Sequence, residues 1–199
     1  GRGCTSLSSI IVEKGNGIYD SREGCNAIIN TNNNELIEGC KNTIIPNSVT
    51  SIGAYALWDR AEFVSVTIPN GVTSIGNGAF YGTGLATVTI PNSVKSIGVY
   101  VFSSCASLSS IIVENGNSYY DSREGCNAII QKNNDELITG CKNTTIPNSI
   151  RSIGVGAFSG CAGLTSIIIP NSVKKISGYS FQECSDLVSI TIPNSVIRR

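Results

Sequence analysis

The sequence predicts a repeat solenoid with a parallel β-sheet on one face, short helical turns or irregular loops on the other, and two β-hairpin insertions. The phrase Ile-Pro-Asn recurs along the 199 residues and uses all six prolines, at spacings of 23, 22, 56, 23 and 23. Residues 4–53 also match residues 105–154 at a constant offset of 101, so a composite block has duplicated. Self-similarity at a fixed period indicates stacked structural units. We therefore expect residues 1–199 to form a single repeat domain, and a fragment of a longer array because the chain begins within a unit.

The first part of each unit predicts a short strand followed by a turn. Between Leu164 and Ile176 the apolar residues fall at positions 1, 4, 6, 10 and 13, which is typical of leucine-rich repeats. Positions 4 and 6 alternate with position 5, as in a strand with one buried face, and proline ends the strand because it cannot donate to a ladder. Proline then suits the second position of a turn and asparagine the third. Eight such strands would end at Val12, Ile45, Ile68, Ile90, Val113, Ile146, Ile169 and Ile192.

The second part of each unit pairs a small residue with an aromatic one. This pairing predicts a short helical turn packed closely on the sheet, with the aromatic rings stacked as an internal spine. A cysteine three residues beyond the ring is expected to be a small buried hydrophobe. The expected spine is Phe80, Phe102, Phe158 and Phe181, and the cysteines are Cys105, Cys161 and Cys184.

The duplicated block predicts a β-hairpin with an asparagine-rich tip at residues 31–34. Symmetric folding about residues 32–33 would place Ile29 opposite Leu36, Ile28 opposite Ile37 and Cys25 opposite Cys40. The second copy would place Cys126 opposite Cys141. Opposed strand residues lie within disulfide range, so the sequence allows either two disulfides or four buried thiols.

Composition excludes several functional classes. Lys plus Arg and Asp plus Glu both number 14, so the basic footprint of a nucleic-acid-binding protein is missing. No apolar run approaches the roughly 18 residues of a membrane span. The chain has no histidine and no Cys-x-x-Cys pair, so neither a zinc site nor a thiol activated by a base is indicated. We predict no enzymatic activity and no cofactor.

The outward-facing positions of the strands form the candidate interaction surface. They are small, neutral and mostly β-branched, which suits sheet formation and weak or broad binding. Trp58, beside Asp59 and Arg60, is a further exposed candidate, although packing also explains it. The charged stretch Asp121, Arg123 and Glu124 is either a recognition motif or a solvated turn. The strand positions chosen for binding are Thr67, Thr89, Ile112, Thr145, Ile168 and Thr191.

The repeated pattern Ile-Pro-Asn-Ser-Val-x-Ser-Ile-Gly-x-x-Ala-Phe-x-x-Cys-x-x-Leu resembles the BspA-like, or Treponema-type, leucine-rich repeat along essentially the whole chain. The unit with Leu57 and Arg60, the unit with Thr83, and Ser177 depart from it. The resemblance implies a bacterial cell-surface or secreted protein that binds host matrix proteins or other cells. The expected function is thus a protein-interaction module for a protein or cell-surface ligand, outside the cell. The alternative is a structural spacer that presents another domain. The oligomeric state stays open.

Overall fold

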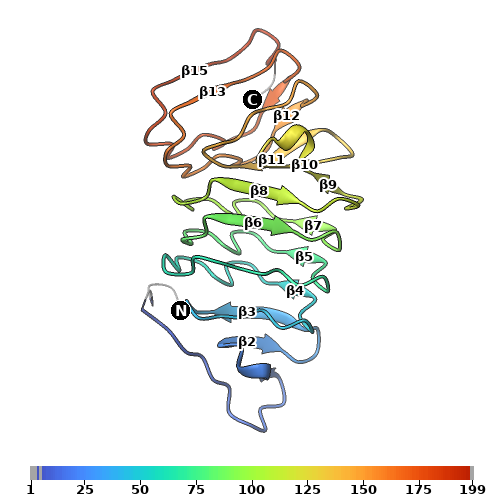
Figure 1. Cartoon of the computed structure of the whole chain (residues 1–199), viewed down its shortest axis with the longest axis vertical. Coiled ribbons are helices and arrows are strands. Elements are labelled where there is room, and N and C mark those ends of the chain that lie inside the picture. The colour runs from blue at the N-terminus through green and yellow to red at the C-terminus, as the bar shows by residue number, and fades with distance from the viewer. Residues whose placement is uncertain (1–3, 5, 198–199) are drawn as a thin grey trace.

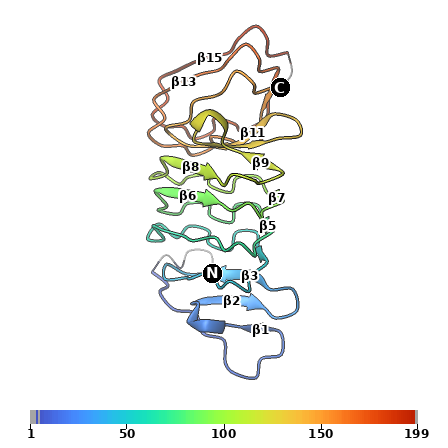
Figure 2. The same ribbon diagram turned by 45° about the vertical axis from the view of Figure 1, so that its right-hand side comes forward.

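The computed structural model describes residue 4 and residues 6–197, which wind into an elongated stack of coils (Figures 1 and 2). The blue N-terminal coils lie at one end of the stack and the red C-terminal coils at the other. Each regular coil contains three stretches in sequence: an extended stretch that ends at proline, a short strand, and a pair of tight turns. The predicted repeat solenoid with parallel strands is confirmed.

The strands that form in this first stretch of the coils pair in parallel, as predicted. β6 (Thr87–Ile90) pairs with β8 (Ser110–Val113), and β13 (Ser166–Ile168) pairs with β15 (Ser189–Thr191). In β6 exposed and buried residues alternate, because one face of the strand covers the core. The prediction of one row of eight strands is wrong, since the other four positions form no regular strand.

The hairpin blocks explain part of this interruption. At residues 143–146 the backbone bonds back to the hairpin: Thr145 N donates to Cys126 O at 3.1 Å. The Thr144 hydroxyl accepts from Cys141 N at 2.8 Å and donates to Asn127 O at 2.7 Å. These hydrogen bonds join residues 143–146 to the hairpin in place of a strand ladder.

The turn after each proline differs from the predicted one by one position. Val49 N donates to Pro46 O at 3.0 Å, so proline occupies the first position of the turn and asparagine the second. The same bond recurs after every proline. The carbonyl of proline accepts the hydrogen bond of the turn, and its missing N–H ends the strand.

A second row of short parallel strands, absent from the sequence prediction, follows this turn and is divided between two sheets. Its strands are Ser-Ile or Lys-Ile pairs in which isoleucine points inward, as Ile52 and Ile75 do at 1% exposure each. The pairing runs in register, with Ile52 beside Ile75 and Ile75 beside Ile97. The strands are β4 (Ser51–Ile52), β5 (Ser74–Ile75), β7 (Ser96–Ile97), β12 (Ser152–Ile153) and β14 (Lys175–Ile176).

Both predicted hairpins form, and each is built into one of these two sheets. β2 (Ala27–Asn30) and β3 (Glu35–Gly39) are antiparallel, β1 (Tyr19–Asp20) pairs with β2, and β3 continues in parallel to β4. The second copy repeats this order with β9 (Tyr120–Asp121), β10 (Ala128–Gln131), β11 (Glu136–Gly140) and β12. The hairpins therefore supply core strands of the solenoid. The 3-10 turns η1 (Arg22–Gly24) and η2 (Arg123–Gly125) are the only helices in the described part of the chain.

The hairpin register is partly as predicted. Ile29 lies opposite Leu36, but a bulge between Ile28 and Ile29 places Ile28 opposite Glu38. The extra residue in β3 shifts every pair below the bulge by one position. The predicted pairing of Ile28 with Ile37 is wrong for this reason.

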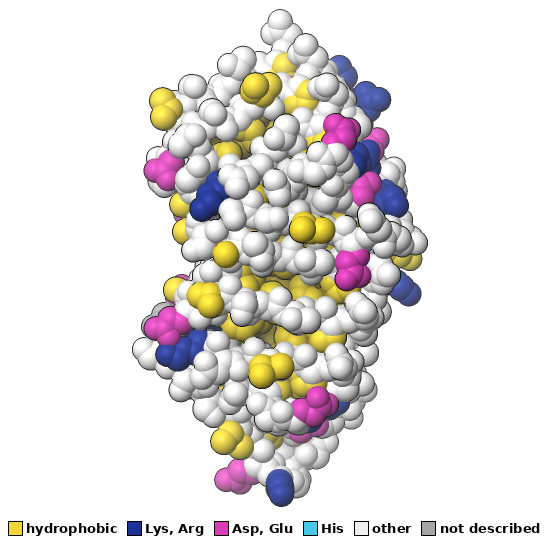
Figure 3. Space-filling model, viewed as in Figure 1, with side chains coloured by type: hydrophobic (Ala, Val, Ile, Leu, Met, Phe, Trp, Pro, Cys, Tyr) yellow, Lys and Arg dark blue, Asp and Glu magenta, His cyan; other side chains and the backbone are white. Residues whose placement is uncertain are grey.

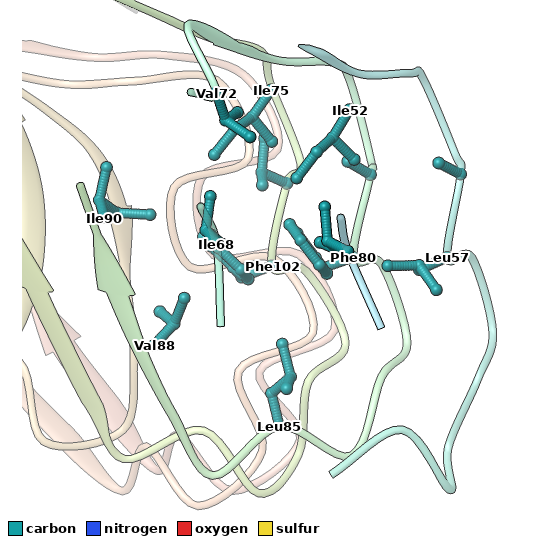
Figure 4. Close-up of a cluster of buried hydrophobic side chains, with 14 of the residues drawn as sticks. Ile52, Leu57, Ile68, Val72, Ile75, Phe80, Leu85, Val88, Ile90 and Phe102 are labelled. Carbon is teal, nitrogen blue, oxygen red and sulfur yellow. The ribbon is translucent and has the colours of Figure 1, made fainter. Parts of the chain in front are cut away.

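The third stretch of each coil contains irregular turns, with no helical turn. Residues at two positions per coil have positive φ, for example Tyr55 at 59° and Asp59 at 58°, which no α-helix tolerates. The aromatic spine forms in two pieces. Phe80 stacks on Phe102 at 5.3 Å between ring centroids and Phe158 on Phe181 at 5.2 Å, and Phe63 extends the first stack at 6.4 Å. Figure 4 shows Phe80 and Phe102 among the isoleucines and valines of the coils.

Candidate interaction surface

The six strand positions chosen for binding all face solvent. Ile168 is 86% exposed and Ile112 is 51% exposed, and the four threonines of the set are also exposed. The neighbours of Ile112 and Ile168, such as Ile167 and Ile169, are buried, whereas Ile192 beside Thr191 is 49% exposed. The predicted alternation is therefore confirmed around Ile112 and Ile168, and the binding role of all six positions stays a prediction.

Two open hollows lie along the C-terminal half of this row. One, of about 550 Å³, is lined by Thr145, Asn148, Ile168 and Asn171 among others. The next, of about 490 Å³, is lined by Ile168 and Thr191 and by the turn at Asn194. Ile168 thus forms the ridge between two hollows with asparagine turns at their rims.

The face that carries β6 and β8 is largely neutral. In Figure 3 isolated hydrophobic side chains lie among uncharged ones along the middle of this face, and most charged side chains lie toward its edges. A neutral, β-branched surface of this kind offers shape and dispersion contacts, with little long-range electrostatic attraction.

The charged stretch of the second block is held by internal ion pairs. Arg123 donates from Nε to Asp121 Oδ1 at 2.9 Å and from Nη1 to Asp135 Oδ1 at 2.7 Å. The hydrogen bond with Asp121 is the main cause that raises the pKa of Arg123. Glu124 is exposed at a φ of 58° beside this cluster. Asp121 and Arg123 therefore join β9 to the hairpin tip, and Glu124 presents the exposed charge.

Trp58 is half-buried and lies against Tyr81, with ring centroids 6.3 Å apart. It lies on the side of its coil that carries the irregular turns, the turn side. The six solvent-facing strand positions named above, the outward row, lie elsewhere on the coils. The structure does not bring Trp58 together with the strand positions or with the Asp121 cluster. The packing explanation accounts for its position.

Arg60, grouped with the exposed candidates by its sequence context, is 1% exposed. Its Nε donates to Gly39 O at 3.1 Å and its Nη2 to Glu38 Oε1 at 2.7 Å. Its Nη1 also reaches Cys4 O at 3.2 Å. The repeated sequence contains a signal for this pair. At the offset of 101 residues Glu38 corresponds to Thr139 and Arg60 to Cys161, so both partners change together.

All eight cysteines are thiols in the structure. The bulge shifts the register, so Cys25 and Cys40 are not opposed: the Cys25 thiol lies 3.7 Å from Ala27 O and the Cys40 thiol 3.3 Å from Asn26 O. Cys126 and Cys141 repeat this arrangement. Of the two alternatives, the structure has the buried thiols.

Cys105 is buried as predicted, whereas Cys161 and Cys184 are only half-buried. The buried and half-buried thiols are poorly suited to chemistry. Burial raises the pKa of Cys126 to about 11 and that of Cys161 to about 12. A nucleophilic thiol needs the opposite shift. Within the described residues no group of three or more His, Cys, Asp or Glu side chains could hold a metal ion. None of the described segments forms a helix long and apolar enough to cross a membrane.

The turn side contains an alternation that the sequence prediction missed. The first left-handed position of successive coils holds Tyr55, Gly78, Tyr100, Gly156 and Tyr179. A Cβ added to Gly78 would lie 2.5 Å from the Tyr55 ring, and one added to Gly156 would lie 2.2 Å from the Tyr100 ring. Each tyrosine ring therefore occupies the space above a glycine of the next coil, and Tyr179, in the last coil, is 66% exposed.

The profile of the BspA type leucine rich repeat region matches residues 28–134 and 131–198, in six copies. The chain belongs to this family. Its members are typically protein-interaction modules of bacterial surface proteins, and they are generally non-catalytic repeat proteins. Among curated protein sequences, none matches the chain.

Solved structures of bacterial leucine-rich repeat proteins share the fold. A leucine rich cell surface protein from Faecalibacterium prausnitzii is 31% identical, with a TM-score of 0.67 over 77% of this chain and 41% of that one. The pneumococcal vaccine antigen PcpA is 24% identical, with a TM-score of 0.67 over 76% and 39%. A leucine-rich repeat protein from Eubacterium ventriosum is 24% identical, with a TM-score of 0.65 over 76% and 47%. This BspA-type chain spans less than half the length of each.

Proposed function

We propose that this chain is a non-catalytic adhesion module of a bacterial surface or secreted protein, which binds host or matrix proteins through the outward row around Ile168. The observation that carries the proposal is the pair of hollows on either side of Ile168, which is 86% exposed on a neutral face. A large exposed apolar side chain between two hollows is a suitable anchor for a protein partner.

Two further facts support an interaction at the cell surface. The family consists typically of modules in bacterial surface proteins, and the 31% identical structure is that of a leucine rich cell surface protein. The small charge of the outward row predicts binding that depends weakly on salt, because few ion pairs would form.

The test measures binding of the purified chain to immobilised matrix proteins and to host-cell surfaces. We expect saturable binding that Ile168→Lys weakens about tenfold or more, the effect of losing an interface anchor. Tyr179→Lys is the matched control, because Tyr179 is also highly exposed but lies on the turn side. Absence of saturable binding to every surface would contradict adhesion and favour a structural spacer. Equal binding by both variants would contradict the outward row as the binding surface.

A further inference from the structure

The turn side repeats every two coils, although the solenoid itself repeats every coil. Each regular coil has two left-handed positions there, four residues apart. In every second coil both positions are glycine, and in the coils between a tyrosine is followed by a polar side chain. The pairs in chain order are Tyr55 with Asp59, Gly78 with Gly82, Tyr100 with Ser104, Gly156 with Gly160, and Tyr179 with Glu183. An aromatic ring and a hydrogen-bonding side chain therefore recur once per two coils.

The tyrosines occupy backbone positions that favour glycine. Their φ angles are 59° at Tyr55, 58° at Tyr100 and 61° at Tyr179, a left-handed conformation that strains residues with a Cβ. Gly78 and Gly156 adopt the same conformation in the coils between, at 58° and 63°, so the fold itself requires no side chain here. Backbone strain that a glycine would relieve indicates a role for the side chain beyond folding.

Packing alone does not account for these rings. Tyr55 is 45% exposed, whereas Phe80 of the internal spine is fully buried. Tyr100 is half-buried although described coils lie against its coil on both sides, so its exposure does not depend on the first or last coil. One edge of Tyr55 lies against Gly78 and one edge of Tyr100 against Gly156, which fixes both rings. A ring that is fixed in advance loses little conformational freedom when a ligand binds.

The three tyrosines form one row along the stack, the tyrosine row. Burial raises the pKa of Tyr100, and the nearby hydroxyls of Tyr179 and Tyr55 raise it further, so both lie near Tyr100. Hydrogen bonds between successive coils, such as Ser104 N to Ser159 O at 3.2 Å, keep the coils at the spacing of strands in a sheet. Rings two coils apart are therefore about 10 Å from each other.

The polar side chains of the same coils form a second row beside the rings. A Cβ added to Gly82 would lie 3.5 Å from Asp59 Oδ1, and one added to Gly160 would lie 2.3 Å from Ser104 Oγ, so both polar side chains extend over the next coil. Asp59 and Ser104 are half-buried and Glu183 is exposed. Their oxygens accept hydrogen bonds, and neither row contains a cation. The two rows therefore suit an uncharged ligand that donates hydrogen bonds and has apolar faces.

A linear polysaccharide has these properties. The C–H groups on the faces of its sugars pack on aromatic rings, and its hydroxyls donate to carboxylate oxygens. In an extended β-linked hexose chain every second sugar presents the same face, at about the spacing of the tyrosine row. An α-linked chain coils and loses this match. A nucleic acid or a sulfated polymer would be repelled by Asp59 and Glu183.

We propose that the tyrosine row binds an uncharged, extended β-linked hexose polysaccharide that lies along the stack. Successive tyrosines stack on every second sugar, and the Asp, Ser or Glu of the same coil accepts hydrogen bonds from sugar hydroxyls. This site lies on the turn side, so it is separate from the outward row and does not depend on the binding of proteins there.

The test is isothermal titration calorimetry of the whole chain with cellohexaose and with chitohexaose, two uncharged β-linked hexamers. We expect at least one to bind, and the α-linked maltohexaose to bind more weakly. Tyr100→Gly removes the central ring and should weaken binding about tenfold or more. The fold accepts glycine at this position, as Gly78 and Gly156 show. Ile168→Lys, on the outward row, is the matched control and should bind as the wild type does.

Four outcomes would overturn the proposal. They are no binding of either β-linked hexamer, equal binding of maltohexaose, unchanged binding by Tyr100→Gly, and weakened binding by Ile168→Lys. If neither hexamer binds but Tyr100→Gly weakens binding to matrix proteins, the row is a protein-binding surface instead. The fluorescence of Trp58, the only tryptophan and also on the turn side, provides a second measure of binding. Thermal unfolding verifies the fold of each variant, and Tyr55→Gly replaces Tyr100→Gly if that variant does not fold.

Discussion

The two copies of the duplicated block, residues 4–53 and 105–154, share nearly every backbone feature and differ where their neighbours differ. Both hairpins contain the same bulge, and Glu23 and Glu124 have the same φ of 58°. Residues 110–113 form strand β8 beside β6, whereas the same four residues at 9–12 form no strand. The comparison shows that this sequence becomes a strand only where a preceding coil supplies the partner.

A second difference lies where each block meets the coil that follows it. At the first block, Arg60 donates to Glu38 and to Gly39 O, and Leu57 packs over Gly39. In the second, the positions of Arg60 and Leu57 are taken by Cys161 and Phe158. The same space is thus filled by a buried ion pair in one copy and by an aromatic ring and a thiol in the other.

The largest effect is expected from breaking the ion pair. Arg60→Cys leaves Gly39 O and Glu38 without their buried partner, and we expect unfolding free energy to fall by about 3–5 kcal/mol in urea denaturation. The triple variant Glu38→Thr, Leu57→Phe, Arg60→Cys copies the second block and should recover most of that loss. If the triple variant is no more stable than Arg60→Cys, the ion pair of the first copy and the ring and thiol of the second are not interchangeable.

Thiol labelling provides the next comparison. At pH 9 a thiol with its ordinary pKa of 9.0 is half ionised, whereas Cys161, with a pKa of about 12, should react on the order of several hundred-fold more slowly. Cys4, which is exposed, should react first, and its counterpart Cys105, which is buried, should react slowly. Mass spectrometry of peptides after timed alkylation measures these rates. Rapid labelling of Cys161 in the folded chain would show that its site is open to solvent.

The raised pKa of Cys161 also makes the stability of the folded state depend on pH. The folded state holds the Cys161 proton more tightly than the unfolded state does, so this contribution is fully present below pH 9 and is lost as the pH rises toward 12. Cys161→Ala should therefore reduce the alkaline loss of stability relative to the wild type. An unchanged alkaline slope in Cys161→Ala would contradict this linkage.

A smaller effect is expected at the two asparagines. Asn117→Ala removes the hydrogen bonds to Pro91 O, which keeps its bond from Val94 N, and to Val94 O, and it should lower the unfolding free energy by about 2 kcal/mol. Asn16→Ala removes the same local bonds to the chain but none to a preceding coil, so we expect less than about 1 kcal/mol. Chemical denaturation of the dilute chain measures the loss of unfolding free energy in each variant. Equal losses would mean that the bonds to the preceding coil add nothing.

Much of the fold follows from the sequence, because proline, isoleucine and phenylalanine repeat at the period of the coil. The alternation around Ile168 and the hairpins were both predictable for this reason. The second row of short strands was not, since a strand of two residues such as Ser51–Ile52 has no periodicity to detect. The bulge at Ile28 was also absent from the prediction, and it changed the outcome for Cys25 and Cys40.

The position of the candidate surface could be predicted from the sequence. The side chains that its residues contact could be predicted less well. Exposure of Ile168 follows from strand alternation, whereas the burial of Arg60 depends on Glu38, 22 residues earlier, and on a space that the second block fills differently. Arg123 looked like a recognition residue because a short charged stretch does not reveal Asp135 on the hairpin tip. Side chains that bind across coils need the stacking order, which the period alone does not provide.

The most direct test of the claim that a covering coil decides the structure is amide hydrogen exchange of residues 9–20 and 110–121 in the dilute chain. The two segments share nine of twelve residues, so their intrinsic exchange rates are similar. We predict that residues 110–121 exchange at least about a hundred-fold more slowly, because β6 and Tyr120 hold them in the sheet. Equal protection of both segments would contradict the account.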